Sequence, residues 1–264
     1  MFTEQSYPRD RLSFDGPRPA RVGLVALATD LTSEADHARL LVRPGLELFV
    51  SRIANANPVT PDNLRAMAPR LSAATDLLLP GAEIDAVIFS CTSASVLIGD
   101  GPVEAAIHAA RPEAAAITPP KAAVSGFHAL GVTRISMLTP YTFEVSRPMA
   151  AYFERNGLAV DRLTALELDD DIVMAQLSSE AIVEAAEAAI TPDAEALFIS
   201  CTAVRSVAVI DRIEAAIGRP VVTSNQAAAW ACLEALGLPG GTRAAGRLMR
   251  GETHKAAALE EPLP

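Results

Sequence analysis

The stretch DAVIFSCTSASVLIGD, Asp85 to Asp100, decides the fold of this chain. Its first part, Ala86 to Phe89, is a continuous apolar run with β-branched and aromatic side chains, which is typical of a buried strand. The run stops at Ser90-Cys91-Thr92-Ser93, and the small apolar residues that follow predict the first turns of a helix. A strand followed at once by a helix places Cys91 at the carboxyl edge of a parallel sheet, where α/β folds bind their ligands.

The same pattern occurs again at Ala196 to Val209, ALFISCTAVRSVAV, with Cys201 in the place of Cys91. Two further pairs of segments match: RVGLVALA with RISMLTP, and AAAITPPKAAVSGFHALG with PVVTSNQAAAWACLEALG. Strands that alternate with helices in this way predict parallel sheets covered on both faces. We therefore expect an α/β protein with two pseudo-symmetric parallel-sheet domains. The first comprises residues 1–122 plus 227–264, the second residues 123–226, and one Ser-Cys-Thr turn from each faces the cleft between them.

Composition limits the partners and the compartment. The net charge is −10 and no Lys/Arg cluster stands out, which argues against nucleic acid and anionic membranes as partners. No apolar run approaches the roughly 20 residues that span a bilayer, and the polar, proline-bearing N-terminus does not resemble a signal peptide. We expect that N-terminus to be an arm over the surface or over a partner subunit. Three cysteines without a CxxC pair fit a reducing cytoplasm and argue against disulfides or a zinc site.

Cys91 and Cys201 are the candidate catalytic residues, because each ends a strand, each is flanked by hydroxyl side chains and each has a twin. Cys232 lies in a helical core pattern, AWACLEAL, and is expected to be a buried packing residue. Two thiols across a cleft can act as base and acid on opposite faces of one carbon, or one thiolate can attack a double bond. Either reaction places negative charge on a carboxylate, and the candidate donors for it are Thr92, Ser93, Thr202 and Tyr141.

Other catalytic arrangements find little support in the sequence. No histidine is adjacent to either cysteine, and the four histidines are scattered at positions expected to be surface or helix residues. Neither GxGxxG nor GxxxxGK[ST] occurs, so we expect no nucleotide cofactor and no cofactor of another kind. The competing class is a non-catalytic small-molecule binding protein built on the same duplicated fold.

These residues resemble the aspartate/glutamate racemase superfamily, and within it the branch of maleate cis-trans isomerase, arylmalonate decarboxylase and the ectoine-utilisation proteins. The resemblance covers roughly residues 21–237 and includes Thr139-Pro140-Tyr141, which matches a TPY-like motif of that branch. It implies that Cys91 is the nucleophile or first acid/base and that Cys201 is its partner. Decarboxylases of the branch keep only the second cysteine, so Cys91 argues against that activity.

The resemblance also implies a substrate-binding set and one departure from it. Maleate isomerases of the branch bind a substrate carboxylate with asparagines in two regions that read Thr29-Asp30 and Asp169-Asp170-Asp171 here. We expect Thr29, Asp30 and Asp171 to bind the substrate. An aspartate repels a dicarboxylate, so Asp30 and Asp171 favour a substrate that carries a cationic nitrogen, such as an ectoine-derived amino acid. The acidic triplet can also be a solvated turn or helix cap. We expect a cytoplasmic isomerase or racemase of a small carboxylate or amino acid that forms a dimer or tetramer. The alternatives are a maleate cis-trans isomerase and a lyase similar to arylmalonate decarboxylase.

Overall fold

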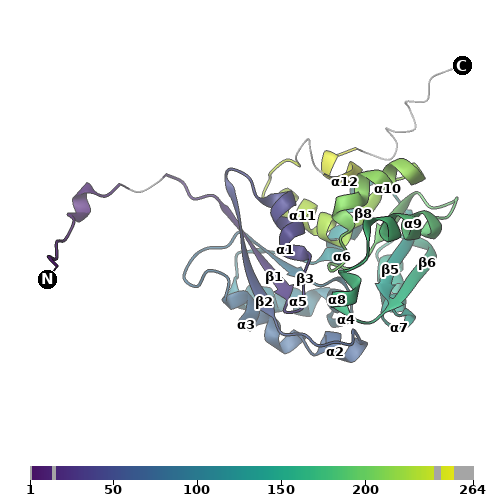
Figure 1. The fold of residues 1–264 in the computed structure, drawn as a ribbon, viewed down its shortest axis with the longest axis horizontal. Helices are drawn as coiled ribbons and strands as arrows, with labels where there is room; N and C mark the ends of the chain where they lie inside the picture. Colours follow the sequence, from purple (N-terminus) through teal and green to yellow (C-terminus); the bar gives the residue numbers. More distant parts are fainter. Residues whose placement is uncertain (1, 14–15, 241–244, 253–264) are drawn as a thin grey trace, which may run out of the picture.

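The computed structural model describes residues 2–13, 16–240 and 245–252 and contains two four-stranded parallel sheets (Figure 1). The first sheet has the order β2-β1-β3-β4, with β1 at Ala20–Leu27, β2 at Leu46–Ile53, β3 at Ala86–Ser90 and β4 at Ala115–Ile117. The second has the order β6-β5-β7-β8, with β5 at Arg134–Tyr141, β6 at Ala159–Leu168, β7 at Ala196–Ile199 and β8 at Val221–Thr223. The two orders are equivalent, so the predicted α/β duplication is confirmed.

The duplication extends to single hydrogen bonds. Every residue of β3 and β7 is buried, as expected for inner strands of parallel sheets covered on both faces. The residue before each of these strands is an acid that binds the start of the neighbouring strand. Asp85 accepts a hydrogen bond from the Arg21 N–H at 2.7 Å, and Glu195 accepts one from the Arg134 N–H at 3.0 Å.

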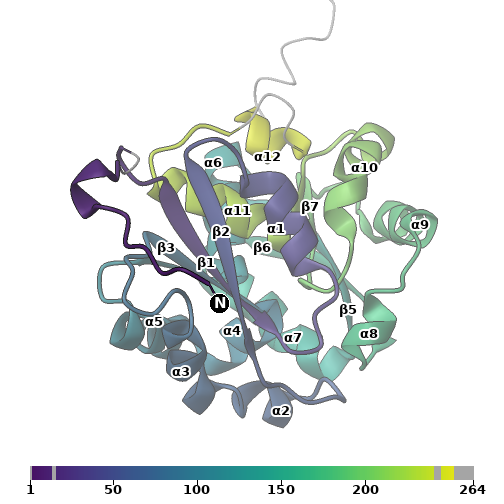
Figure 2. The same ribbon diagram turned by 60° about the vertical axis from the view of Figure 1, so that its left-hand side comes forward.

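Helices cover both sheets, and one helix of each half lies on the sheet of the other half (Figures 1 and 2). On the first sheet, α3 (Leu71–Asp76) and α5 (Asp100–Ala110) lie opposite α1 (Ser33–Leu41) and α11 (Ser224–Ala235). The helices around the second sheet are α6 (Pro119–Leu130), α7 (Phe143–Arg155), α9 (Ser179–Ala189) and α10 (Ile210–Ile217). Phe127 of α6 packs edge-on against Phe198 of β7, with ring centroids 6.2 Å apart.

The helix α11 therefore returns from the end of the second half to contact α1, β3 and β4 of the first. The expected domain boundary at residue 122 falls within α6. The boundaries themselves remain a prediction, and residues 253–264 of the expected first domain lie outside the described residues.

Short helices complete the connections: η1 (Arg9–Arg11), α2 (Pro61–Arg65), η2 (Ala68–Arg70), α4 (Thr92–Ile98), α8 (Asp171–Met174), η3 (Ser206–Val209) and α12 (Gly246–Arg250). The helix α7 begins at Phe143, so Pro148 lies inside it rather than in its first turn. Its first turns bury Val145 and Ser146, and this packing outweighs the preference of proline for a helix start. The cap of α9 is Ser178, whose hydroxyl accepts the Ala181 N–H.

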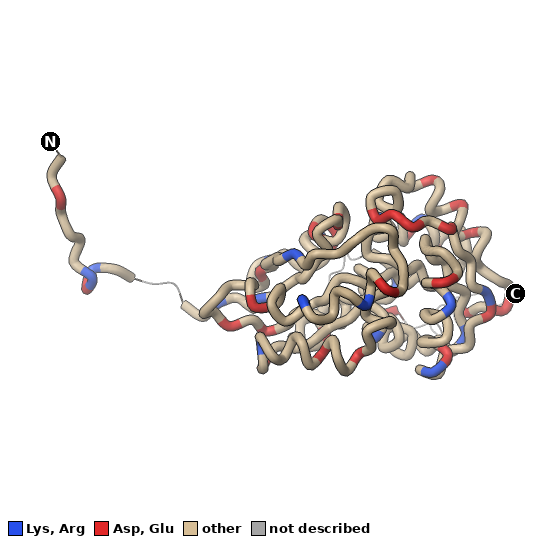
Figure 3. Tube along the Cα trace, turned by 90° about the horizontal axis from the view of Figure 1, so that it is seen from below, with Lys and Arg blue, Asp and Glu red and all other residues tan. Residues whose placement is uncertain are grey.

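The N-terminal segment, residues 2–13, is exposed along its described length and projects from the body of the molecule (Figures 1 and 3). The expected alternative of an arm lying over its own surface is therefore not what this structure contains. Among the described residues, no helix combines the length and the apolar character needed to cross a membrane.

Candidate active site

A small cavity lies where the carboxyl ends of β1, β3, β5 and β7 meet, between the two halves. Its lining includes most of the residues that the sequence singled out: Asp30, Cys91, Ser93, Tyr141, Asp171, Cys201 and Thr202, together with Leu27, Leu64 and Ala203. The volume is about 10 Å³, close to the smallest space that holds one water molecule. The two predicted thiols thus share one enclosed cavity, and a substrate requires that cavity to widen.

The two Ser-Cys-Thr turns have different backbones. Cys91 is the N-cap of α4 with an extended backbone, and its Sγ lies 3.8 Å from the Ser93 hydroxyl. After Cys201 no helix begins until η3, and Cys201 has a φ of 87°, in a region that L-residues rarely adopt. The Cys201 Sγ accepts the Ala203 N–H at 3.3 Å. Such backbone strain costs on the order of 1–3 kcal/mol and clusters at functional sites.

Burial dominates the electrostatics of the thiols. It raises the pKa of both Cys91 and Cys201 to about 12, and the carboxylate of Asp171 acts on both in the same direction. Hydrogen bonds from Ala94 to Cys91, and from Tyr141 and Ala203 to Cys201, oppose that rise in pKa. Burial likewise holds the pKa of Tyr141 well above its usual value. In this closed conformation both cysteines are neutral thiols at physiological pH.

Asp171 is the first residue of α8 and is 6% exposed. Its Oδ2 accepts hydrogen bonds from the Thr29 hydroxyl at 2.9 Å and from the Asn55 amide at 3.1 Å. Among the described residues the structure gives Oδ1 no hydrogen-bond donor. Burial raises the pKa of this carboxyl, while the two donors oppose the rise. Asp171 is therefore a buried carboxylate that lines the cavity and not part of a solvated turn. The helix-cap alternative holds for its neighbour Asp170, whose side chain accepts the Ile172 and Val173 N–H groups at the start of α8.

Asp30 lines the same cavity, yet its oxygens are occupied by its own chain. Oδ1 accepts the backbone N–H groups of Thr32 and Ser33, each at 2.7 Å, and Oδ2 accepts the Ser33 hydroxyl. Asp30 thus binds the start of α1 with both of its side-chain oxygens. The Thr92 side chain is also engaged elsewhere, because its hydroxyl donates to Ser224 of α11 at 2.8 Å.

Sequence reasoning missed Asn55 and the three apolar lining residues, Leu27, Leu64 and Ala203. Asn55 holds Asp171 and donates to the Thr29 hydroxyl at 2.8 Å, and its position just beyond β2, at the ligand-binding edge of the sheet, was a usable signal. Leu64 of α2 lines the cavity, but an apolar residue in a short helix carries no such signal. His37 is helical, as expected, but lies fully buried in α1, and His254 lies outside the described residues.

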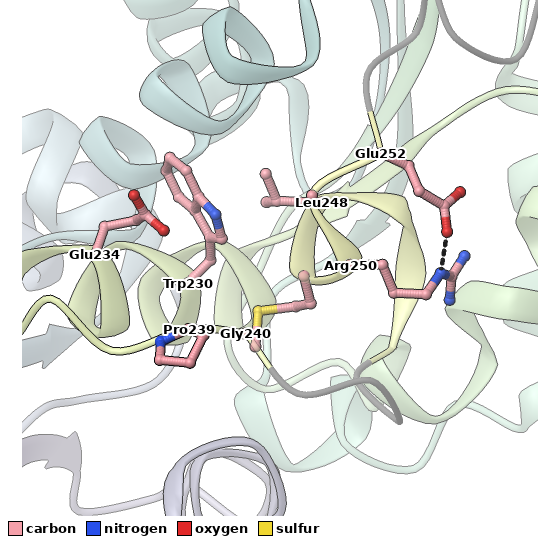
Figure 4. Close-up of a pocket in the computed structure, with 9 residues that line it drawn as sticks. Trp230, Glu234, Pro239, Gly240, Leu248, Arg250 and Glu252 are labelled. Carbon is pink, nitrogen blue, oxygen red and sulfur yellow. Dashed lines mark hydrogen bonds and ion pairs between the residues drawn. The ribbon is translucent and has the colours of Figure 1, made fainter.

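A separate hollow of about 460 Å³ lies between α11 and α12 (Figure 4). Its lining includes Trp230, Leu248 and Arg250, and Arg250 pairs with Glu252 at 2.6 Å. None of the predicted site residues lines it. Within residues 2–13, 16–240 and 245–252, no group of three His, Cys, Asp or Glu side chains is placed to hold a metal ion.

Two equivalent α/β halves, each with one cysteine in a shared cavity, define an enzyme of the aspartate/glutamate racemase superfamily. Comparison with known proteins narrows this class. The family model described as arylmalonate decarboxylase matches residues 47–249, and the chain belongs to that family.

The relatives that match over most of their length are isomerases. The maleate isomerase of Nocardia farcinica is 29% identical over 248 residues, which cover 90% of this chain and 98% of that protein. The maleate isomerase of Pseudomonas putida is 25% identical over 88% of this chain and 97% of its own. The arylmalonate decarboxylase of Bordetella bronchiseptica is 31% identical, but over 46% of this chain and 50% of that protein.

Among solved structures, both maleate isomerases and arylmalonate decarboxylases match over most of their length; a double mutant of arylmalonate decarboxylase gives a TM-score of 0.75 at 27% identity, over 87% of this chain and 98% of that one. The maleate isomerase of Pseudomonas putida S16 superimposes with a TM-score of 0.80 at 25% identity, over 88% of this chain and 98% of that one. A mutant of the Nocardia farcinica maleate cis-trans isomerase with a covalently bound succinylcysteine intermediate gives 0.81 at 25% identity, over 89% and 99%. The fold is thus that of these isomerases, and the chain is an enzyme of the isomerase class.

Proposed function

We propose that this chain is a cofactor-independent isomerase or racemase of a small carboxylate or amino acid that uses Cys91 and Cys201 as a pair. One observation carries the proposal: the two thiols come from equivalent turns of opposite halves and line one cavity. A binding protein does not need two thiols at equivalent turns, one of them on a strained backbone.

Two reactions fit this pair. In the first, one thiolate adds to a carbon of a double bond, and the electron pair moves onto the adjacent carboxylate as an enediolate. The other thiol delivers its proton to the enediolate carbon, which gives a thioether with a single carbon–carbon bond. After rotation about that bond the second thiolate takes the proton back as the first thiolate is expelled, so the isomerised substrate and both starting groups are returned. In the second, one thiolate removes the proton from a stereocentre and the other thiol delivers a proton to the opposite face. The succinylcysteine of the Nocardia relative supports the first reaction.

The polar residues of the cavity can serve either reaction. The hydroxyls of Ser93 and Tyr141 lie on the cavity wall and can donate to the developing enediolate. The Thr202 hydroxyl donates instead to the Ser90 carbonyl at 3.1 Å, so we assign it to holding the turn. Because both thiols have a pKa of about 12 in the closed cavity, ionisation must accompany the opening that admits substrate.

Asp171 affects which substrates the cavity can bind. Its Oδ1 is available to the cavity, so we propose that it accepts a hydrogen bond from a substrate ammonium or hydroxyl group and disfavours a second carboxylate. An ectoine-derived amino acid is one candidate of this kind, in line with the resemblance to ectoine-utilisation proteins. Maleate is the alternative substrate, because this chain matches a maleate isomerase over nearly the full length of that protein. An arylmalonate-type decarboxylation is a third candidate, because the matching family model is described as arylmalonate decarboxylase.

The decisive experiment compares the parent with Cys91→Ala and Cys201→Ala on a panel of small carboxylates and amino acids. The assays follow loss of optical rotation, loss of the cis double bond and release of carbon dioxide. Each variant should lose about 10²–10⁴-fold in kcat, since each thiol handles a proton or a bond in the same reaction. Each should remain folded, because the change removes one small atom beside a cavity.

The outcomes separate the candidates. Near-parental activity of Cys91→Ala alone would replace the two-thiol mechanism with a one-cysteine lyase. Efficient conversion of maleate at pH 8, unchanged by Asp171→Asn, would remove the proposed role of Asp171 and restore maleate as the substrate.

We also propose that the enzyme works in the cytoplasm as a dimer or tetramer. The three free cysteines are all buried, which is compatible with a reducing compartment. The exposed N-terminal arm supports association with a second copy.

A further inference from the structure

The two cysteine turns are tied to each other through the first residues of α11. The Thr92 hydroxyl, next to Cys91, donates to the Ser224 hydroxyl at 2.8 Å. The Thr202 carbonyl, next to Cys201, accepts from the Asn225 amide at 3.0 Å. Ser224 and Asn225 are adjacent residues and are 0% and 1% exposed. One rigid helix start therefore contacts the residue that follows each thiol.

A direct link closes the arrangement. The Thr202 hydroxyl donates to the carbonyl of Ser90, the residue before Cys91, at 3.1 Å. The Asn225 amide also donates to Asp36 of α1 at 2.8 Å, which fixes its orientation with both N–H groups directed at acceptors. Its own oxygen is buried without a partner. A buried oxygen without a partner costs free energy, so the two hydrogen bonds that the Asn225 amide donates must offset that cost.

These side chains are not needed to begin the helix. Thr223 and Gln226 already form a capping box, in which the Thr223 hydroxyl accepts the Gln226 N–H and the Gln226 side chain accepts the Thr223 N–H. The equivalent helix of the first half, α6, has Pro119 and Pro120 as its first two residues, and proline offers no such donors. The polar pair is therefore particular to α11 and is not a requirement of the duplicated fold.

We propose that Ser224 and Asn225 are positioning residues that hold the Cys91 and Cys201 turns at the separation that two-thiol chemistry requires. The proposal rests on the proposed function, in which both thiols act on one small molecule. The need for such support is greatest at Cys201, whose φ of 87° persists only where neighbouring contacts enforce it. A shift of one thiol by about 1 Å can cost about 100-fold in rate.

The experiment uses Ser224→Ala, Asn225→Ala and the conservative Ser224→Thr, with Gln226→Ala as the matched control. Gln226→Ala breaks the capping box of the same helix but touches neither cysteine turn. The first readout needs no substrate: the rate at which iodoacetamide labels each cysteine, separated by peptide mass. Cys232, buried in the same α11, reports general loosening of that helix.

We expect Ser224→Ala to raise labelling of Cys91 and Asn225→Ala to raise labelling of Cys201, each at least threefold, while Cys232 keeps its parental rate. Ser224→Thr, which retains the hydroxyl, should restore the parental pattern. Gln226→Ala should lower the melting temperature without changing the labelling of Cys91 relative to Cys201. With a turned-over substrate, the two Ala variants should lose about 10–100-fold in kcat with KM changed less than threefold.

Parental labelling of Cys91 in Ser224→Ala and of Cys201 in Asn225→Ala would overturn the proposal. Equal acceleration of all three cysteines would do the same, because it would show a merely structural role. If labelling changes as expected but no carboxylate is turned over by the parent, the positioning role stands and the proposed function fails.

Discussion

At the scale of single residues, Asp30 and Asp171 are both buried carboxylates beside the cavity, but their hydrogen bonds separate their roles. Asp30 directs both oxygens at the start of α1, whereas Asp171 directs only Oδ2 at its own chain. The sequence assigned both to the substrate, because both occupy positions where relatives of the branch bind a carboxylate. Which of two neighbouring acids is free depends on the loop conformation, and no residue pattern encodes that directly.

Asp171→Asn should make both active-site thiols more reactive. The Asp171 charge raises the pKa of Cys91 and Cys201, so its removal lowers both values and increases the thiolate fraction at any pH below about 12. Iodoacetamide labelling between pH 8 and 10 should be several-fold faster than in the parent, and in both proteins should rise about tenfold per pH unit. Asp169→Asn is the control, since it removes the same charge from an exposed residue of the same turn. Equal rates in the two variants would exclude this electrostatic coupling.

Asp36→Asn should stabilise the protein at neutral pH but not at acid pH. Burial raises the pKa of Asp36 from 3.8 to about 6, so the folded state favours the protonated form. The stability that this shift contributes is complete below pH 3.8 and is lost as the pH rises through 6. With about 1.4 kcal/mol per pKa unit, the loss is about 2–3 kcal/mol. The neutral amide escapes this loss and keeps an acceptor for Asn225.

Urea unfolding of the parent and Asp36→Asn at pH 4 and pH 8 measures this difference. The gain in free energy of unfolding should appear at pH 8 and vanish near pH 4. Asp62→Asn, at a side chain that is 99% exposed, serves as the control and should show no such gain. A gain of the same size at both pH values would point to packing rather than ionisation.

At the scale of elements, the sequence predicted what depends on local pattern. The continuous apolar run expected at β3 and its repeat at β7 both form strands whose residues are all buried. Both cysteines lie at the strand ends where the pattern put them. The paired segments also identified the duplication, because they repeat strand, turn and helix together.

What the sequence could not predict depends on contacts between distant elements. The two Ser-Cys-Thr turns read alike, yet only Cys91 begins a helix at once, whereas Cys201 adopts a positive φ. The hydroxyl of Thr92 was expected in the cavity but donates to Ser224, a residue 132 positions away. The contact between Asn55 and Asp171 likewise joins residues 116 positions apart. Such pairings appear only when the two sheets are assembled.

At the scale of the whole molecule, the N-terminal arm, residues 2–13, stands out because all of its residues are exposed. Three large apolar side chains of the arm are exposed: Phe2 is 84% exposed, Tyr7 64% and Leu12 48%. Arg18, which follows the arm, pairs with Glu83 and Asp85 just before β3. Within residues 2–13 every residue is exposed, so these apolar side chains have no surface of their own chain that covers them, and we predict that a second copy of the chain provides one.

Removal of residues 2–17 should therefore weaken self-association while the catalytic body stays folded, since Arg18 and the sheets are retained. Sedimentation velocity over a range of concentrations should give a dimer or tetramer for the parent and a smaller species for the truncated chain. The triple variant Phe2→Ser, Tyr7→Ser and Leu12→Ser keeps the length of the arm and should show the same shift, because burial of these side chains drives the association. Labelling of Cys232 at the parental rate would show that the body is intact. A parent that sediments as a monomer, or a truncated chain with the parental mass, would remove the arm from any role in assembly.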